Sequence, residues 1–249
     1  MTEHSDDTNM PLTAHLLELR TRLLRIVLVV LLIFAALIGF ANELYTLVAT
    51  PLLDALPIGS QMIATEVASP FLTPFKLALV MAVFIAIPHI LFELWGFIAP
   101  GLFRHEKRLA APLLLISVLL FYAGVAFAYF VVFPLIFAFF SATGPAGVSY
   151  TPDIARFLDT ALKLFFAFGL AFEVPIIVMV LIYTGATTIE ALTRKRPFVI
   201  VGCFVVAMLL TPPDPISQSL MALPMWLLFE LGIVCSRLIR RKKQSTTNS

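Results

Sequence analysis

Two carboxylates stand among arginines and lysines, each beside a long apolar run. Glu18 lies where leucines recur at helical spacing, and Glu106 lies in a short polar segment between two apolar stretches. Each could form an ordinary exposed ion pair, Glu18 with Arg22 one helical turn on, worth at most about 1 kcal/mol. Alternatively, both carboxylates receive a basic partner from outside the chain. Arginine suits such a site because its planar guanidinium binds a carboxylate through two hydrogen bonds.

A further carboxylate, Glu173, lies in the middle of an otherwise uncharged run. Inside a membrane, such a group costs several kcal/mol unless it is protonated, paired or in contact with water. We expect Glu173 either to have a function or to form a structural hydrogen bond to a neighbouring helix, for which Gln218 is a candidate. His89, in another apolar run, is expected to be packed and hydrogen-bonded, with proton transfer as the alternative.

Prolines dominate the segment Thr211–Pro215, which joins two apolar runs. They predict a rigid turn with few hydrogen-bond donors. A tight connector explains the prolines fully, but it leaves Asp214 and Gln218 without a role.

Nothing in the sequence indicates an enzyme. It has no glycine-rich phosphate loop followed by lysine, no His/Cys cluster at metal-ligand spacing and no Ser/His/Asp set. We therefore expect no cofactor, no metal site and no nucleic-acid partner.

The composition is that of a membrane protein. Of the 249 residues, 60% are hydrophobic and 13% are charged, against about 25% charged in soluble domains. The apolar runs predict a single all-α membrane domain over residues 1–249, with 1–11 and 238–249 as flexible tails. Its six membrane-spanning helices are expected near residues 23–41, 74–95, 109–140, 157–183, 197–211 and 216–235.

The expected helices differ in length. The third uncharged run would form a helix of roughly 48 Å, so it must tilt strongly or project from the membrane, with a kink expected at Pro134. The fifth and sixth runs have only about 14 uncharged residues each and are expected to form a short hairpin.

The cations predict the orientation. All but three of the 17 lysines and arginines lie before the first run, between the second and third, before the fifth or after the sixth. Six crossings place these segments on one face, which the positive-inside rule makes cytoplasmic. Both ends of the chain are therefore expected in the cytoplasm.

Several segments together resemble the TatC family, the receptor core of the twin-arginine protein translocase. They are His15–Arg20, Ala68–Phe71, Phe97–Leu102, Arg104–Arg108, Phe121–Tyr122, Phe127–Pro134, Phe168–Gly169, Phe172–Pro175 and Leu210–Asp214. The resemblance covers Thr13 to Arg237 in order. It implies a glove-like six-helix bundle with a concave face and two short C-terminal helices.

The resemblance also implies a function. The chain would bind twin-arginine signal peptides of folded proteins on the cytoplasmic side of the bacterial inner membrane. With the single-span subunits TatA and TatB, and in a receptor complex with further copies of itself, it would support export driven by the proton-motive force.

Roles for individual residues follow from the same motifs. Around the signal peptide the resemblance places Glu18, Glu106, Leu19, Arg20, Phe97 and Arg108. It places Glu173 as a membrane-embedded acid on the concave face. Pro51 and Phe71 fall in the first outer loop, and Asp214 and Gln218 at the outer end of the short helices, near TatA or TatB. The cations Arg104, Lys107 and Arg108 would repel paired arginines, so Glu106 is expected to point away from them, towards Glu18.

Two other functions stay open at this level. The first is a small-solute secondary transporter with Glu173 and His89 as a proton relay, although the chain has no internal repeat typical of such transporters. The second is a membrane scaffold without a receptor site, which would not distinguish paired arginines from paired lysines.

Overall fold

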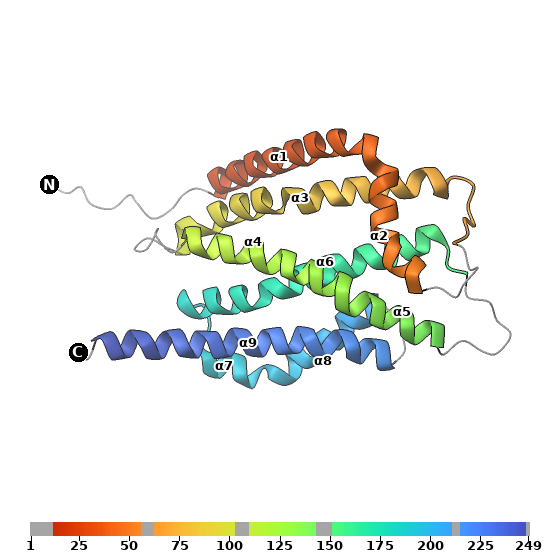
Figure 1. The fold of residues 1–249 in the computed structure, drawn as a ribbon. Coiled ribbons are helices and arrows are strands. Elements are labelled where there is room, and N and C mark those ends of the chain that lie inside the picture. The colour runs from red at the N-terminus through yellow and green to blue at the C-terminus, as the bar shows by residue number, and fades with distance from the viewer. Residues whose placement is uncertain (1–11, 56–61, 103–109, 143–150, 211–214, 248–249) are drawn as a thin grey trace.

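The computed structural model describes residues 12–55, 62–102, 110–142, 151–210 and 215–247. Within these ranges every regular element is helical, apart from an isolated bridge between Ile63 and Asp153. The long helices lie side by side as an elongated bundle (Figure 1). The predicted all-α membrane bundle is confirmed.

The helices follow the apolar runs of the sequence. Their bounds are α1 Leu12–Leu37, α2 Ala41–Ala55, α3 Ser69–Leu102, α4 Ala110–Phe127, α5 Phe133–Ala142, α6 Ile154–Tyr183, α7 Ile189–Arg194, α8 Arg196–Leu210 and α9 Pro215–Thr247. A 3-10 turn, Ile38–Phe40, joins α1 to α2, and a π-helical segment, Ala128–Val132, joins α4 to α5.

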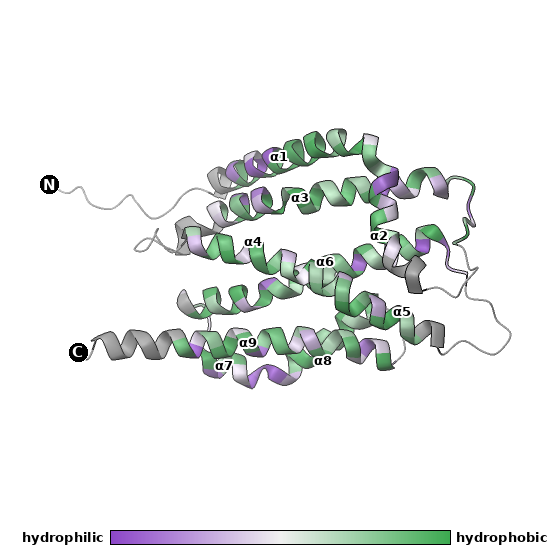
Figure 2. Ribbon diagram, in the orientation of Figure 1, coloured by the Kyte–Doolittle hydropathy of each residue, from purple (hydrophilic) through white to green (hydrophobic). Residues whose placement is uncertain are grey.

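The outer surface of the bundle is suited to contact with lipid. In the described chain, five helices are long and apolar enough to cross a membrane, and α8 is a shorter apolar helix of 15 residues. Hydrophobic residues cover the middle of the bundle (Figure 2), and outward-facing side chains such as Phe130 and Phe198 are 72% and 78% exposed. Such extensive apolar exposure is rare in soluble proteins.

Glycines allow the central helices to approach closely. A Cβ atom at Gly124 of α4 would lie 2.3 Å from the carbonyl oxygen of Phe168 in α6. One at Gly232 of α9 would lie 2.9 Å from the Cα atom of Pro175 in α6. Small residues at helix interfaces are the usual means of close packing in membranes. They place α6 between α4 and α9, at the centre of the bundle.

The long third run, where a kink was expected at Pro134, contains a π-helical segment just before that proline. The backbone N–H of Phe133 donates to the carbonyl of Ala128, a π-type bond, immediately before Pro134. Proline has no N–H with which to continue the α-helical pattern, so the local backbone changes its hydrogen bonding at this point.

Two segments differ from the sequence-based expectation. Ala41–Ala55, expected within a long connection, forms α2 because Val48 and Ala49 are buried against the core on one helical face. Of the two C-terminal helices expected to be short, only α8 is so. The last helix, α9, has 33 residues and continues to Thr247, through most of the segment expected to be a flexible tail.

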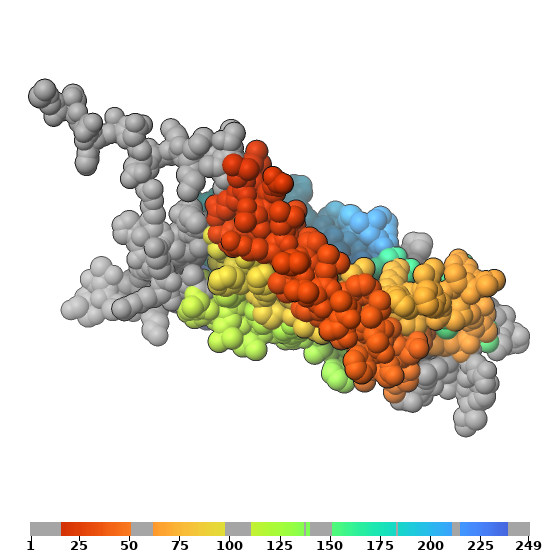
Figure 3. Space-filling model, turned by 90° about the horizontal axis from the view of Figure 1, so that it is seen from above, coloured from red at the N-terminus to blue at the C-terminus, as the bar shows by residue number. Residues whose placement is uncertain are grey.

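The start of α1 and the end of α9 lie at the same end of the bundle (Figure 1). Seen from the face in Figure 3, α1 and α2 lie over α3 at the edge of the molecule. The carboxylate Glu18 lies near the start of α1, where this helix packs on the last part of α3.

Candidate functional site

Glu18 forms the ion pair that its spacing allows. Its Oε1 atom accepts hydrogen bonds from Nε of Arg22 at 3.0 Å and from Nη2 at 2.6 Å. The Glu18 side chain is 33% exposed, and its second oxygen, Oε2, has no hydrogen-bond partner among the described residues. Glu18 therefore combines a fixed position with an oxygen that is free to accept a further donor.

A second carboxylate, which is not among the candidates predicted from the sequence, contacts Arg22 of this pair. Glu93 of α3 is almost fully buried, with a side chain only 4% exposed. Its Oε2 atom accepts from Nη1 of Arg22 at 2.9 Å, and its Oε1 atom from Nη1 of Arg25 at 3.5 Å. The available signal was an acid inside the predicted span 74–95, close to its end.

The guanidinium of Arg22 is held on all sides. Besides the two carboxylates, the carbonyl oxygens of Glu93 and Gly96 accept from it at 3.3 and 3.1 Å. A Cβ atom at Gly96 would lie 2.5 Å from Nη1 of Arg22, so glycine leaves room for this contact. Arg22 thus joins α1 to α3 through side chain and backbone together.

The other residues predicted around the signal peptide are only partly described. Leu19 and Arg20 are exposed on α1 beside Glu18, and Phe97 lies half-buried near the end of α3. Glu106 and Arg108 lie outside the described residues, together with Arg104 and Lys107. The expected orientation of Glu106 towards Glu18 therefore stays a prediction.

Glu173 is buried in α6, as the apolar run around it predicted. It is 8% exposed, and its Oε1 atom has no hydrogen-bond partner within the described chain. The candidate neighbour Gln218 is not brought to it. The residue of α9 that lies against Pro175 is Gly232, and roughly 21 Å of helix separates Gln218 from Gly232. His89 likewise has an Nε2 atom without a partner among the described residues.

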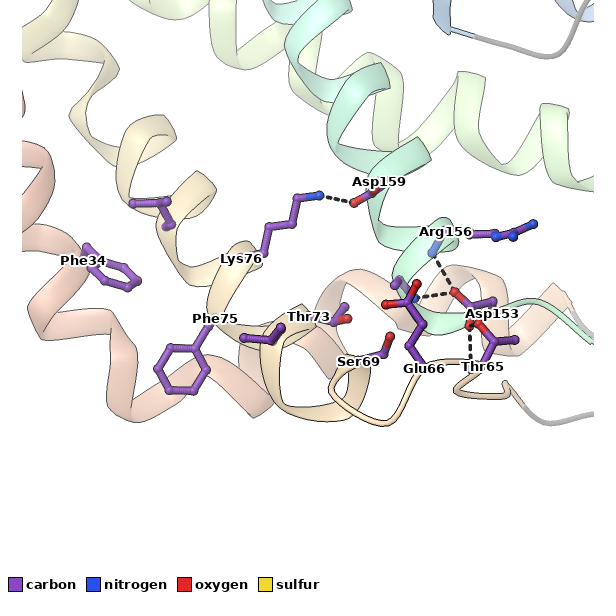
Figure 4. Close-up of a pocket in the computed structure, with 13 residues that line it drawn as sticks. Phe34, Thr65, Glu66, Ser69, Thr73, Phe75, Lys76, Asp153, Arg156 and Asp159 are labelled. Atoms are coloured by element: carbon purple, nitrogen blue, oxygen red, sulfur yellow. Dashed lines mark hydrogen bonds and ion pairs between the residues drawn. The ribbon is translucent and has the colours of Figure 1, made fainter.

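At the opposite end of the bundle, α1, α3 and α6 border a cavity of about 580 Å³ (Figure 4). An ion pair between Lys76 of α3 and Asp159 of α6 lies at its wall. Other lining residues include Glu66 and Arg156, so charges of both signs surround the cavity.

Asp153, at the rim of this cavity, is the N-cap of α6. Its carboxylate accepts from the backbone N–H groups of Ala155 and Arg156 at 3.0 and 2.9 Å. It also accepts from the backbone and hydroxyl of Thr65 at 2.9 and 2.7 Å. These hydrogen bonds, first among them the one from Arg156, lower the pKa of Asp153 to about 2. The contact fixes the segment before α3 to the start of α6.

The residues assigned to partner contacts lie at this same end or outside the description. Phe71 is exposed in the first turns of α3, with its ring centroid 4.6 Å from that of Phe75. Pro51 belongs to α2, so the expectation that Pro51 and Phe71 lie in an outer loop was wrong for both. Gln218 belongs to the first turns of α9. Asp214 lies outside the described residues.

Neither catalysis nor metal binding is supported by the described side chains. Among the residues that the structure describes, no three His, Cys, Asp or Glu side chains are close enough to hold a metal ion. Cys203 and Cys235 are free and half-buried. The arrangement at Glu18 is suited instead to binding a cationic group by hydrogen bonds.

Comparison with known proteins gives a consistent result. The family model described as Sec-independent protein translocase protein (TatC) matches residues 14–224. The TatC protein of Azotobacter chroococcum mcd 1 is 58% identical over 245 residues, 98% of this chain and 96% of that protein. The TatC protein of Escherichia coli (strain K12) is 53% identical over 233 residues, 94% of this chain and 90% of that protein.

A solved structure is similar as well. The crystal structure of a twin arginine translocase receptor, TatC, superposes with a TM-score of 0.81 at 38% sequence identity. The match covers 90% of this chain and 98% of that one.

Proposed function

The chain belongs to the TatC family of the Sec-independent protein translocase, and we propose that it is the subunit that binds twin-arginine signal peptides. Its role lies in Tat protein translocation and not in catalysis. It is a multi-pass protein of the bacterial inner membrane. Binding of the signal peptide is the step that we assign to Glu18 and Glu106.

The proposal rests on the hydrogen bonding and the exposure of the Glu18 carboxylate. Its carboxylate is held by Arg22 through Oε1, while Oε2 has no partner in the described chain and the side chain is partly exposed. A guanidinium from outside could therefore donate to Oε2 without displacing Arg22. Charge-assisted hydrogen bonds of this kind are about twice as strong as neutral ones.

The remaining parts of the proposal concern orientation and partners. Both ends of the chain face the cytoplasm, where cargo proteins carrying the signal peptide are made. The chain acts with TatA and TatB and with further copies of itself, and the proton-motive force drives export. The common end of α1 and α9 supports an even number of crossings, and clustered cations support the cytoplasmic assignment.

Further roles are assigned to residues away from Glu18. Glu173 serves as a polar group within the membrane, beside the path of the cargo. Asp214 and Gln218 lie near the site where TatA or TatB packs, and Pro51 and Phe71 belong to the outer cap of the concave face. The transporter alternative, with Glu173 and His89 as a relay, is not favoured by membership of a protein-translocase family.

Site-specific crosslinking tests the proposal. A photoreactive residue at Leu19, which is 43% exposed, leaves both carboxylates in place. We expect crosslinks to a signal peptide with Arg-Arg and several-fold fewer to the same peptide with Lys-Lys. Glu106→Gln should weaken the crosslinks while the protein remains inserted and stable.

The control is the same photoreactive residue at Leu47 of α2, also exposed but far from Glu18. Equal crosslinking of the two peptides at Leu19 would contradict the receptor function. It would favour the scaffold without a receptor site.

A further inference from the structure

Glu93 is the feature of the bundle for which neither the family resemblance nor the proposed function gives a reason. It is a carboxylate, 4% exposed, bonded to Arg22 and Arg25, and it lies on α3 rather than on the helix that carries Glu18. We propose that Glu93 is a positioning residue for twin-arginine recognition, whose negative charge keeps the surroundings of Glu18 attractive to a cation. This inference rests on the proposed function.

Counting charges shows what Glu93 does. Two acids, Glu18 and Glu93, and two bases, Arg22 and Arg25, form one connected cluster with no net charge. Without the charge of Glu93, the remaining groups carry a net positive charge beside Glu18. This positive charge would repel the paired arginines of a signal peptide from the carboxylate of Glu18.

Glu93 also fixes the orientation of the Arg22 guanidinium. The bonds from Nη1 of Arg22 to Glu93 fix the guanidinium plane, and Nε and Nη2 of that plane both donate to Oε1 of Glu18. Glu93 therefore acts on Glu18 through Arg22. Because Oε1 of Glu18 accepts both hydrogen bonds, Oε2 remains able to accept one from an arginine of the signal peptide.

The substitution Glu93→Gln separates charge from shape. Glutamine has nearly the same size, and its side-chain oxygen can still accept from Arg22, so the contact between α1 and α3 is retained. Arg25 is 62% exposed, and Arg25→Gln removes a positive charge from the edge of the cluster. The double variant Glu93→Gln/Arg25→Gln restores the net charge of the cluster without restoring the carboxylate.

The experiment measures binding of a fluorescent signal peptide with Arg-Arg to the full chain in lipid nanodiscs. We expect about tenfold weaker binding by Glu93→Gln at low salt, because the variant leaves an uncompensated positive charge in the cluster, which repels the cationic peptide. The loss should shrink as salt is raised, because added ions screen the uncompensated charge. The double variant should recover most of the lost binding, because it removes the uncompensated positive charge.

A matched control is Glu190→Gln, the same chemical change at an exposed acid in the first turn of α7. It should leave binding unchanged. Undiminished binding by Glu93→Gln, or a loss that neither salt nor Arg25→Gln reverses, would overturn the inference. If the unaltered chain binds Arg-Arg and Lys-Lys peptides equally, the proposed function itself fails, and that outcome is visible before any variant is made.

Discussion

Arg22 shows how a single side chain can hold two helices and a binding group in register. Its guanidinium makes five hydrogen bonds, to Glu18, to the side chain and carbonyl of Glu93 and to the carbonyl of Gly96. Lysine could not replace it, because an ammonium group lacks the planar set of donors that reaches all these acceptors at once.

Asp153 is the corresponding residue at the other end of the bundle, and its charge contributes to stability. Its pKa is lowered from 3.8 to about 2 by hydrogen bonds to the ionised form. A lowered pKa in the folded state means that the contribution is complete above about pH 4 and is lost as the pH falls towards 2.

We expect Asp153→Asn to lower the free energy of unfolding by about 1 kcal/mol at neutral pH, because asparagine still caps the helix but lacks the negative charge that strengthens these hydrogen bonds. The difference from the unaltered protein should shrink between pH 4 and pH 2, where the aspartate becomes protonated. Unfolding in detergent micelles over this pH range measures it, with the exposed Glu43→Gln as a control expected to show no effect. A difference that stays constant down to pH 2 would rule out a contribution from the charge.

Residue patterns anticipated local contacts better than distant ones. The pair Glu18–Arg22 was among the predicted alternatives because the two are one helical turn apart. The bond from Arg22 to Glu93 was not predicted, because 71 positions separate these residues along the chain. Likewise, Gln218 was proposed beside Glu173 on polarity alone, whereas helix register brings Gly232 to that part of α6.

Among the helices, the close packing of α4 against α6 depends on the lack of a side chain at Gly124. A Cβ atom at Gly124 would lie 2.3 Å from the carbonyl oxygen of Phe168, a backbone atom that cannot rotate away. We expect Gly124→Ala to separate the two helices and to cost about 1–3 kcal/mol. Thermal unfolding of the purified chain, read by retained helical signal, measures the change.

Gly202 of α8 is the matched control, because a Cβ atom there would have no heavy atom within 4 Å. Gly202→Ala should leave the unfolding temperature unchanged or raise it, since alanine favours a helix over glycine. Equal losses for Gly124→Ala and Gly202→Ala would contradict the close-packing account of α4 and α6.

Apolar runs located the long helices because lipid requires uninterrupted backbone hydrogen bonding within each span. The same rule could not locate α2, which is set by burial of Val48 and Ala49 against other helices. Nor could it set the end of α9, because the last turns of that helix are polar and extend beyond the apolar part that ends near Leu238.

At the scale of the whole molecule, α8 is shorter than the helices that are long enough to cross a membrane. The 15 residues of α8 form a helix of roughly 22 Å, shorter than a hydrocarbon core of about 30 Å. We propose that this short helix thins the bilayer locally and that a folded cargo protein crosses there.

We expect insertion of one apolar turn after Val205 in α8 to reduce export several-fold by restoring normal thickness. The control is a one-turn insertion after Arg240, beyond the apolar part of α9. Export of a twin-arginine cargo by cells producing each variant, corrected for protein abundance, measures the effect. Normal export by the α8 variant at normal abundance would show that a short α8 is not needed.

The bonds between Arg22 and Glu93 also bear on how the chain is made. All their donors and acceptors lie between residues 18 and 96, within the first two long helices to be synthesised. The buried carboxylate can therefore find its counter-charge while the rest of the chain is still on the ribosome, as domains that fold from the N-terminus do. The charge of Glu93 therefore needs no partner from a later helix, and an unpaired charge within a membrane is costly.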